Sequence, residues 1–478
     1  MDWSRRRFIQ KLTLAGAGVG AGLGAACFSQ SRDSLAILPP TDEVLGIKPA
    51  FSTPRNESFA LAKFFPSLID PEAKQGPLIV NSLSKDESSA DSVRQGEAGN
   101  AVFFRPSSQR AVIPWTPLFA REQNLLQLPP SLTQRLGCSE LLVWNESSAE
   151  HPMFGNKARK YEFLLPNLKW SGVESTATLG AVSSNHALQF ALANRMADLT
   201  GAGEPLNSEL DLVLFEVPGV PTDEKRLALL RQLSKRVVLT KNMFGLAGEV
   251  AYELAIQRMH AYTNAIVPPG GSNELSVLGH MNGIADFARF LESSRAWDAP
   301  PDFVFVAMGS GSTALGLILG IHLLGWNTQV VGVADQDKNY MSRMVANQKP
   351  SSPFVEGNVL KLADKAIGWL KDIQFPGIEL DSRQLLRREA FLPDSHSWGP
   401  GYGLVEKTDI AWREELESAG LKLDSVFTLK AWRSLVSMAD SGMLKNKRVL
   451  FWNTYNSFDY AGYAQPFLSD LGQHHAAI

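Results

Sequence analysis

The sequence contains little of what usually identifies metal-binding, disulfide-bonded or nucleic-acid-binding proteins. Its two cysteines, Cys27 and Cys138, are too few for a disulfide framework. Its 8 histidines are scattered, so no spacing indicates a zinc site and we expect no bound metal. The formal net charge of -3 provides no electrostatic attraction for phosphate backbones, so we expect no nucleic-acid partner.

The composition is that of a folded globular protein. Hydrophobic residues make up 44% of the chain and charged residues 20%, which excludes a largely disordered protein. Because 478 residues exceed what one hydrophobic core usually supports, we expect two or more folding units.

The N-terminal segment, residues 1–27, resembles a twin-arginine export signal. The basic run Arg5–Arg7 precedes a Gly/Ala-rich apolar segment, Leu12–Ala26. A basic region followed by roughly 15 weakly apolar residues is typical of a cleaved signal and is short for a membrane span. We therefore expect a periplasmic or inner-membrane-associated protein; an uncleaved tail on a cytoplasmic protein is the alternative. Cys27 follows three small residues, which is similar to a lipoprotein processing site and leaves membrane attachment through Cys27 open.

The next segment, residues 28–105, is rich in proline, serine and charged residues, as in LPPTDE and SKDESSADS. Few of its stretches could bury an apolar face. We predict an irregular extension or linker there, with one short helix near Phe59–Phe65.

From Leu141 onward, short apolar runs alternate with longer periodic stretches, which predicts an α/β fold with a parallel sheet. The runs VFVAM and VVGVA are continuously apolar, so their strands should be covered on both faces. The predicted strands are Thr176–Leu179, Leu210–Phe215, Arg236–Leu239, Phe303–Ala307, Gln329–Ala334 and Val449–Trp452.

The run GNKARKYEFLL places a lysine at the start of a helix. Gly155 and Asn156 favour a turn, and the apolar residues that follow recur at helical spacing, so Lys157, Arg159 and Lys160 should occupy the first helical turn. Cations there face the positive end of the helix dipole and one another, so we expect a compensating anionic group nearby. The same effects lower a lysine pKa, as an amine that attacks an aldehyde requires. Lys157 is therefore the candidate nucleophile.

Small polar residues stand at three strand exits, each just before a helix: at residues 183–185, 270–273 and 309–313. Free N–H groups at helix starts bind anions, and in open parallel sheets such strand ends face one crevice. We expect the ligand there. The sequence Gly309-Ser310-Gly311-Ser312-Thr313 fits a phosphate-binding loop best, because its glycines let the backbone approach an oxyanion.

Two of these motifs resemble a known family. GNKARKYEFLL and SSNHALQFALANR, at matched spacing, are similar to the cofactor-lysine motif and the following QSNH helix of the D-cysteine desulfhydrase and 1-aminocyclopropane-1-carboxylate deaminase family. The resemblance runs from about Thr116 to about Asn456. It implies a pyridoxal-phosphate enzyme with the tryptophan synthase beta-like fold, and a homodimer. In that fold two doubly wound parallel-sheet subdomains hold the cofactor in the cleft between them; here the catalytic domain would span 106–478, with a smaller subdomain at about 150–290 inserted in it.

The resemblance also implies roles for individual residues. Lys157 would bind the cofactor, and Lys157 or Lys160 would remove the substrate α-proton. Ser184 would hold the carboxylate of a small amino-acid substrate, and Asn185 the ring oxygen of the cofactor. Thr428 would contact the pyridine nitrogen of the cofactor, and Tyr402 would lie over the cofactor face. The cofactor phosphate would be bound by the loop Gly309, Ser310, Gly311, Ser312 and Thr313.

The chain departs from this family at Phe427, where a tyrosine implicated in proton transfer is expected, and at Ser312, where a glycine is usual. Loss of a general acid or base typically costs about 10²–10⁴-fold in rate. A neutral partner such as Thr428 also leaves the pyridine nitrogen largely unprotonated. We therefore predict β-elimination of the D-cysteine desulfhydrase kind. Alternatives are 1-aminocyclopropane-1-carboxylate deaminase activity and a catalytically weakened pyridoxal-phosphate-binding protein of the cell envelope.

A remote alternative is an NAD-dependent dehydrogenase. Residues 309–314 also fit G-x-G-x-x-A, and Asp335 follows about where a ribose-binding acid would lie. This interpretation leaves the basic helix start at Lys157 unexplained.

Overall fold

The structure is a computed structural model. It describes residues 99–104, 110–115, 125–147, 153–170, 173–196, 205–216, 222–241, 245, 248–250, 252–253, 264–294, 296–334, 354–372, 375, 377–388, 390–394, 397, 399–400 and 404–455. The predicted signal segment with Cys27, the helix expected near Phe59–Phe65, and the candidates Tyr402 and Asp335 lie outside these residues.

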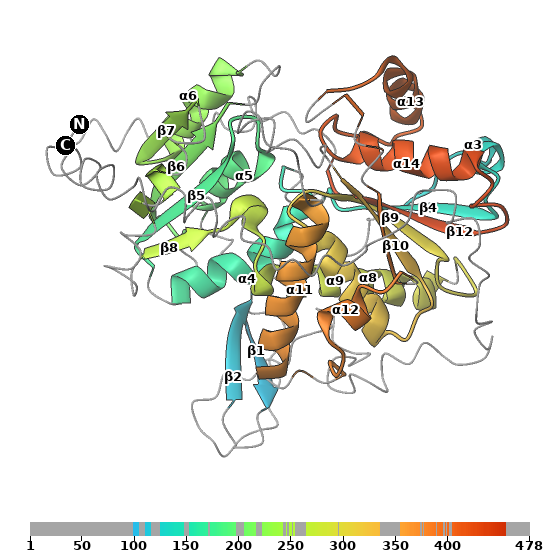
Figure 1. Cartoon of the computed structure of the whole chain (residues 1–478), viewed down its shortest axis with the longest axis horizontal. Coiled ribbons are helices and arrows are strands. Elements are labelled where there is room, and N and C mark those ends of the chain that lie inside the picture. Colours follow the sequence, from blue (N-terminus) through green and yellow to red (C-terminus); the bar gives the residue numbers. More distant parts are fainter. Residues whose placement is uncertain are drawn as a thin grey trace, which may run out of the picture.

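The larger of two parallel sheets has six strands in the order β11-β10-β9-β12-β4-β3 (Figure 1). Their bounds are Phe391–Asp394 (β11), Gln329–Ala334 (β10), Phe303–Met308 (β9), Arg448–Asn453 (β12), Glu140–Asn145 (β4) and Leu125–Leu126 (β3). All neighbours are parallel except β3, which pairs antiparallel with β4. The last long strand, β12, lies in the middle of the sheet, so this core is completed only when the chain from β3 to β12 has come together.

The smaller sheet has four parallel strands in the order β7-β6-β5-β8. Their bounds are Arg236–Thr240 (β7), Glu209–Phe215 (β6), Ser175–Ala181 (β5) and Asn264–Val267 (β8). The chain therefore leaves the larger sheet after β4, builds the smaller one, and returns to the larger sheet at β9. This is the α/β architecture with parallel sheets that the sequence predicts.

Helices cover both faces of the larger sheet. Alternate side chains of each strand point to opposite faces, and here the side chains on both faces are apolar. Val304 and Val306 of β9 join one apolar cluster with α8 (Glu274–Ser294), α9 (Ser312–Leu323) and α11 (Phe354–Asp372). Phe305 joins a second cluster on the opposite face with α3 (Pro130–Leu136) and α14 (Thr428–Asp440), beside which α13 (Lys407–Ser418) lies. The strongly apolar strands are thus buried on both sides.

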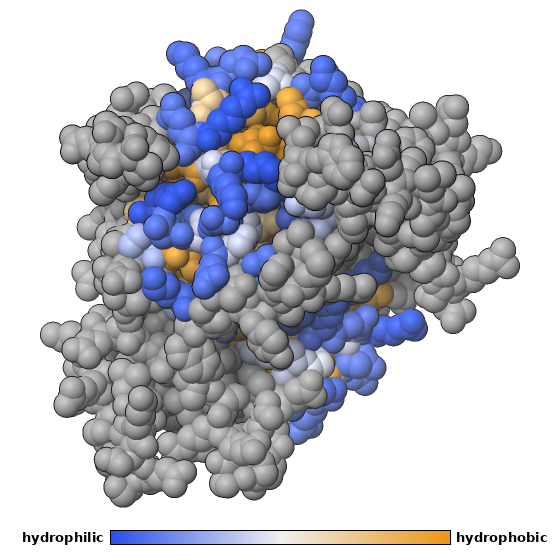
Figure 2. All heavy atoms as spheres, turned by 90° about the vertical axis from the view of Figure 1, so that its left-hand side faces the viewer, coloured by the Kyte–Doolittle hydropathy of each residue, from blue (hydrophilic) through white to orange (hydrophobic). Residues whose placement is uncertain are grey.

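The smaller sheet has a core of its own. It is built with α4 (Lys157–Trp170), α5 (Asn185–Ala193) and α6 (Glu224–Leu233). On the face of the molecule that carries this sheet, the described residues are mainly hydrophilic, and apolar side chains show only in patches between them (Figure 2). Short helical segments at Pro269–Gly271 (η4) and Ser382–Leu385 (α12) complete the fold. Among the described residues, no helix combines the length and the apolar character that a bilayer crossing requires.

The predicted irregular extension up to residue 105 is wrong at its C-terminal end. Gly99–Phe104 (β1) and Arg110–Trp115 (β2) form an antiparallel pair, and β2 contacts α4. The sequences GNAVFF and RAVIPW contain the aromatic and β-branched residues that strands favour. The composition of the whole segment concealed this local signal.

Candidate active site

A cavity of about 520 Å³ lies between the two sheets, where the carboxyl ends of their strands meet. Its wall includes Ala181 at the end of β5, Phe215 at the end of β6, Gly309 after β9 and Thr454 after β12. Such strand ends are the usual ligand-binding edge of open parallel sheets. The three polar strand exits that the sequence singles out all reach this cavity.

Lys157 is the first residue of α4 and is held at the cavity by the turn before it. The N–H of Asn156 donates to the Thr454 carbonyl at 2.8 Å. Gly155 has φ 53°, and a Cβ on it would lie 2.4 Å from the same carbonyl oxygen, so a side chain there would push the turn away from the end of β12. The expected turn and helix start are confirmed.

The Lys157 amine is shifted towards its uncharged form. Burial lowers its pKa from 10.5 to about 8; the charge of Asp424 opposes this shift and that of Arg226 adds to it. At pH 7 about a tenth of the amine would be uncharged. The direction agrees with the prediction but the main cause differs, because desolvation rather than neighbouring cations is the largest effect.

The anions expected near this basic helix start pair with Arg159. Its guanidinium is buried and bonds the Glu146 carboxylate at 3.3 Å and Asp286 at its other side. The pair with Asp286 ties α4 to α8. Arg159 is therefore structural and leaves the two lysines to face the cavity.

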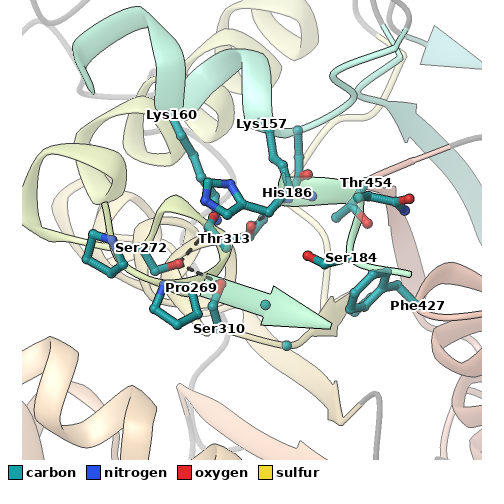
Figure 3. A pocket seen from close by; sticks show the side chains of 18 of the residues that line it. Lys157, Lys160, Ser184, His186, Pro269, Ser272, Ser310, Thr313, Phe427 and Thr454 are labelled. Carbon is teal, nitrogen blue, oxygen red and sulfur yellow. Dashed lines mark hydrogen bonds between the residues drawn. The ribbon is translucent and has the colours of Figure 1, made fainter. Parts of the chain in front are cut away.

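Lys160 lies one turn further along α4 and points towards the second and third strand exits. Its Nζ donates to the Gly270 carbonyl at 2.8 Å and to Ser272 Oγ at 3.2 Å. Burial, followed by the charge of Lys157, holds its pKa well below the usual value. Figure 3 shows that the two lysines face different parts of the cavity. Lys160 lies over Ser272 and Ser310, whereas Lys157 lies towards Ser184, Thr454 and Phe427. Because the Lys160 amine is engaged by Gly270 and Ser272, Lys157 is better placed than Lys160 to carry a proton in the cavity.

The predicted phosphate loop has the geometry of an anion cradle. Gly311 has φ 92° and precedes α9, and it has no side chain that could cap the first N–H groups of this helix. A Cβ at Gly311 would lie 2.7 Å from Val359 Cγ2, so α11 packs too closely for any other residue. Ser272 Oγ lies 2.6 Å from Ser310 Oγ and 2.9 Å from Ser312 Oγ. Backbone N–H groups and hydroxyls therefore converge at one point.

The start of α5 forms the opposite part of the wall. Ser184 is its N-cap, yet the hydroxyl makes no capping hydrogen bond, which leaves it available to a ligand. Beside it, His186 is buried; its Nε2 lies 3.1 Å from Thr178 Oγ1, and its Nδ1 has no hydrogen-bond partner among the residues that the structure describes. Burial keeps the His186 pKa well below its usual value, so the ring presents an uncharged acceptor.

The structure places Thr428 outside the cavity wall, so its contact with the pyridine nitrogen stays a prediction. Its hydroxyl is fully buried and does not line the cavity, because it bonds Asp424 Oδ2 at 2.9 Å and lies 3.3 Å from the Tyr455 carbonyl oxygen. The Asp424 carboxylate also accepts the N–H groups of Phe427 and Thr428 and so caps α14. Phe427, not Thr428, faces the cavity.

Most other candidates are brought together at the cavity. The predicted residues in its wall are Lys157, Lys160, Ser184, Asn185, Gly309, Ser310, Gly311 and Thr313, and Ser312 is buried directly behind them. Wall residues that sequence reasoning missed include Asn156, His186, Ser272, Thr454 and Tyr455. Ser272 could have been found, because it lies in the polar strand exit at residues 270–273.

Comparisons with known proteins agree with this geometry. The sequence pattern of the family described as "Pyridoxal-phosphate dependent enzyme" matches residues 116–365, just over half of the chain. A D-cysteine desulfhydrase of Klebsiella pneumoniae is 27% identical over 338 residues, which cover 69% of this chain and 90% of that protein. A candidate 1-aminocyclopropane-1-carboxylate deaminase of Pyrococcus horikoshii is 27% identical over 351 residues, or 72% of this chain and 90% of that protein.

A crystal structure of an ACC deaminase homologue superimposes with a TM-score of 0.55 at 22% sequence identity, covering 75% of this chain and 96% of that one. This likeness supports the fold. Together with the family match over residues 116–365, it confirms the resemblance noted in the sequence. The chain belongs to the family of pyridoxal-phosphate dependent enzymes.

Proposed function

We propose that this protein is a pyridoxal-phosphate-dependent lyase that eliminates a leaving group from the β-carbon of a small amino acid. D-cysteine is the first substrate to test; with one water it would give pyruvate, hydrogen sulfide and ammonia. One observation carries the proposal: the half-buried amine of Lys157 stands between an anion cradle and an apolar ring, Phe427. The names of the relatives support it.

The described residues fit the cofactor. The first N–H groups of α9, with the hydroxyls of Ser310 and Thr313, would hold its phosphate, and the uncharged Lys157 amine would bind its aldehyde. Asn156 Nδ2 donates to Thr313 Oγ1 at 2.8 Å and so fixes this threonine relative to Lys157. Bound there, the cofactor supplies an electron sink that stabilises negative charge at the substrate α-carbon.

The other steps belong to the protein side chains. Ser184 Oγ and the first N–H groups of α5 would bind the substrate carboxylate, and Lys157 Nζ would take the α-proton. Phe427 offers no proton to a departing group. A thiol, with an ordinary pKa of about 8.5, leaves as a thiolate without such help, whereas a ring carbon does not. This difference favours a desulfhydrase over a ring-opening deaminase.

The proposal is tested with the full-length protein. The visible spectrum should show a bound chromophore, and borohydride treatment followed by peptide mapping should place the label on Lys157. A panel of D-cysteine, L-cysteine, D-serine, chloroalanine and 1-aminocyclopropane-1-carboxylate is then assayed for ketoacid and, with cysteine, for sulfide. Sulfide and pyruvate in equal amounts from cysteine support the proposal; a labelled residue other than Lys157 overturns it.

Two second candidates are separated by the same panel. Ketoacid from the cyclopropane amino acid alone would indicate a deaminase. No ketoacid from any compound, with the chromophore present, would indicate the catalytically weakened binding protein that Phe427 and Ser312 suggest.

We also propose that the chain is exported as a folded protein by its twin-arginine-like segment, residues 1–27, and acts as a homodimer in the periplasm or at the inner membrane. The basic run and the apolar segment Leu12–Ala26 support export. Fractionation of cells that express wild-type protein or the R5K/R6K/R7K variant tests it, and light scattering gives the oligomeric state. Equal distribution of both proteins would contradict export.

A further inference from the structure

Arg226 lies beside the start of α5 without lining the cavity. It belongs to the first turn of α6, where the Asp223 side chain accepts the N–H of Arg226 at 3.1 Å and fixes the helix start. From there its guanidinium crosses to the strand exit after β5. Its Nη2 donates to the Ser184 carbonyl at 2.6 Å and to Asn185 Oδ1 at 3.3 Å.

These contacts determine which end of the Asn185 amide faces the ligand. A guanidinium has only donors, so the amide oxygen of Asn185 must be the end that meets Arg226. Asn185 lines the cavity and Arg226 does not. The remaining end of the amide, the Nδ2 donor, is therefore the one available to a ligand. With any residue that cannot donate at position 226, the amide would lose this restraint.

The guanidinium also places a positive charge behind a turn that already attracts anions. The first N–H groups of α5 point towards the same region, and Ser184 adds an uncommitted hydroxyl. The influence of Arg226 extends to Lys157, whose pKa it lowers further. Arg226 is partly buried, so solvent screens this charge less than it screens an exposed one.

We propose that Arg226 is a positioning residue that makes the start of α5 selective for a free α-carboxylate: it holds the Asn185 donor towards the cavity and adds a positive charge behind Ser184. The identity of the ligand as an amino acid rests on the proposed function. The effect on Lys157 does not, and the two can be measured separately.

The first experiment needs no turnover. In the cofactor-free protein, the rate of Lys157 acetylation by acetic anhydride is followed against pH by mass spectrometry. Replacing Arg226 by Met should move the midpoint to higher pH, because a positive charge that disfavours the ammonium is lost. R226K should stay close to wild type. R231M removes an exposed arginine from the same helix and is the matched control.

The second experiment compares D-cysteine with its methyl ester, which lacks the carboxylate charge. R226M should raise KM for D-cysteine about tenfold and leave kcat within about twofold, since a charge-assisted interaction of this size is lost in binding. The preference of the wild-type enzyme for the acid over the ester should fall by a similar factor. R226K should retain part of the preference for the acid over the ester, and R231M should behave as wild type.

The outcomes separate the two proposals. If R226M keeps both the Lys157 midpoint and the preference for the acid, the role of Arg226 is wrong. If the wild-type protein turns over no amino acid, the proposed function fails, while the acetylation profile still decides the effect of Arg226 on Lys157. Should R226M not fold by circular dichroism, R226Q, which keeps a donor but no charge, replaces it; an unchanged Lys157 midpoint in R226Q then overturns the electrostatic part.

Discussion

The Lys157 ammonium lies 6.0 Å from the centre of the Phe427 ring, at the limit of a cation–π contact. The ring comes from the residue before α14 and presents a carbon face to the amine that would carry the cofactor. At this position the cavity has an apolar wall instead of a proton donor. The reaction that the site can support therefore depends on how much help the leaving group needs.

Phe427→Tyr is predicted to change which substrate is used. A hydroxyl on this ring would supply the missing proton donor, so release of 2-oxobutyrate from 1-aminocyclopropane-1-carboxylate should rise by about tenfold or more. The rate with D-cysteine should change less, because a thiolate leaves unaided. The measurement is kcat/KM for both compounds.

Phe215→Tyr is the matched control, since Phe215 also lines the cavity but lies at the end of β6. It should leave the ratio of the two activities unchanged. If both variants raise the deaminase activity equally, a specific role of position 427 is excluded.

Lys157→Ala is predicted to abolish borohydride labelling and to reduce turnover to the background level. The variant retains the anion cradle of α9, so weak non-covalent binding of pyridoxal phosphate should persist. Lys169→Ala, in the last turn of the same helix, is the control and should label normally. Labelling of the Lys157 variant at Lys160 would show that the second amine can replace the first.

The pH dependence of cofactor binding should follow the pKa of Lys157. In the cofactor-free protein, the rate of pyridoxal phosphate capture is expected to rise with pH and to reach half its maximum at about pH 8, since only the uncharged amine reacts. Asp424 raises this pKa, so Asp424→Asn should lower it and move the midpoint to lower pH. Asn can still accept at the start of α14. Asp381→Asn, at the exposed cap of α12, should leave the midpoint in place.

The parts of the fold that depend on local sequence could be predicted. The six predicted strands are present, each within two residues of its expected ends, because they are continuous apolar runs with β-branched residues. Lys157 at a helix start and the glycine loop before α9 follow from turn chemistry of the same local kind. No bounds were predicted for β3, β4, β8 and β11; of these, β3, β8 and β11 have only two to four residues, which carry too little periodicity.

Contacts between distant segments could not be predicted. The role of Ser272 depends on Lys160 and on Ser310, which are far from it in the chain. These hydrogen bonds of Ser272 are determined by tertiary packing. Thr428 is a different case: its role was taken from the family resemblance, which does not show that its hydroxyl also donates to Asp424, four residues earlier.

Ser272→Ala should weaken cofactor binding. A hydroxyl has one proton, so Ser272 can donate to Ser310 or to Ser312 but not fully to both, while it accepts from Lys160. Its loss frees both loop hydroxyls and one Lys160 donor, and the dissociation constant of pyridoxal phosphate should rise by about tenfold. Fluorescence titration of the cofactor-free protein measures this. Ser293→Ala, on the exposed part of α8, should have no effect.

Glu146→Gln should destabilise the whole larger core, because it leaves the Arg159 charge only partly compensated. Glu146 is fully buried at the end of β4, accepts from Trp144 Nε1 at 3.0 Å and bonds Arg159 at 3.3 Å. Breaking a buried pair from one side typically costs about 3–5 kcal/mol, and urea unfolding of the cofactor-free protein should show a loss of that order.

The exposed pair between Arg135 and Glu415 provides the contrast for this prediction. Glu415→Gln should cost less than about 1 kcal/mol, since solvent screens the pair. Because Arg159 lies two residues after Lys157 on α4, loss of its partner should also loosen the helix start and weaken cofactor binding. A Glu146→Gln protein that unfolds at the wild-type urea concentration would mean that packing of α4 on α8, rather than the ion pairs, holds Lys157 at the cavity.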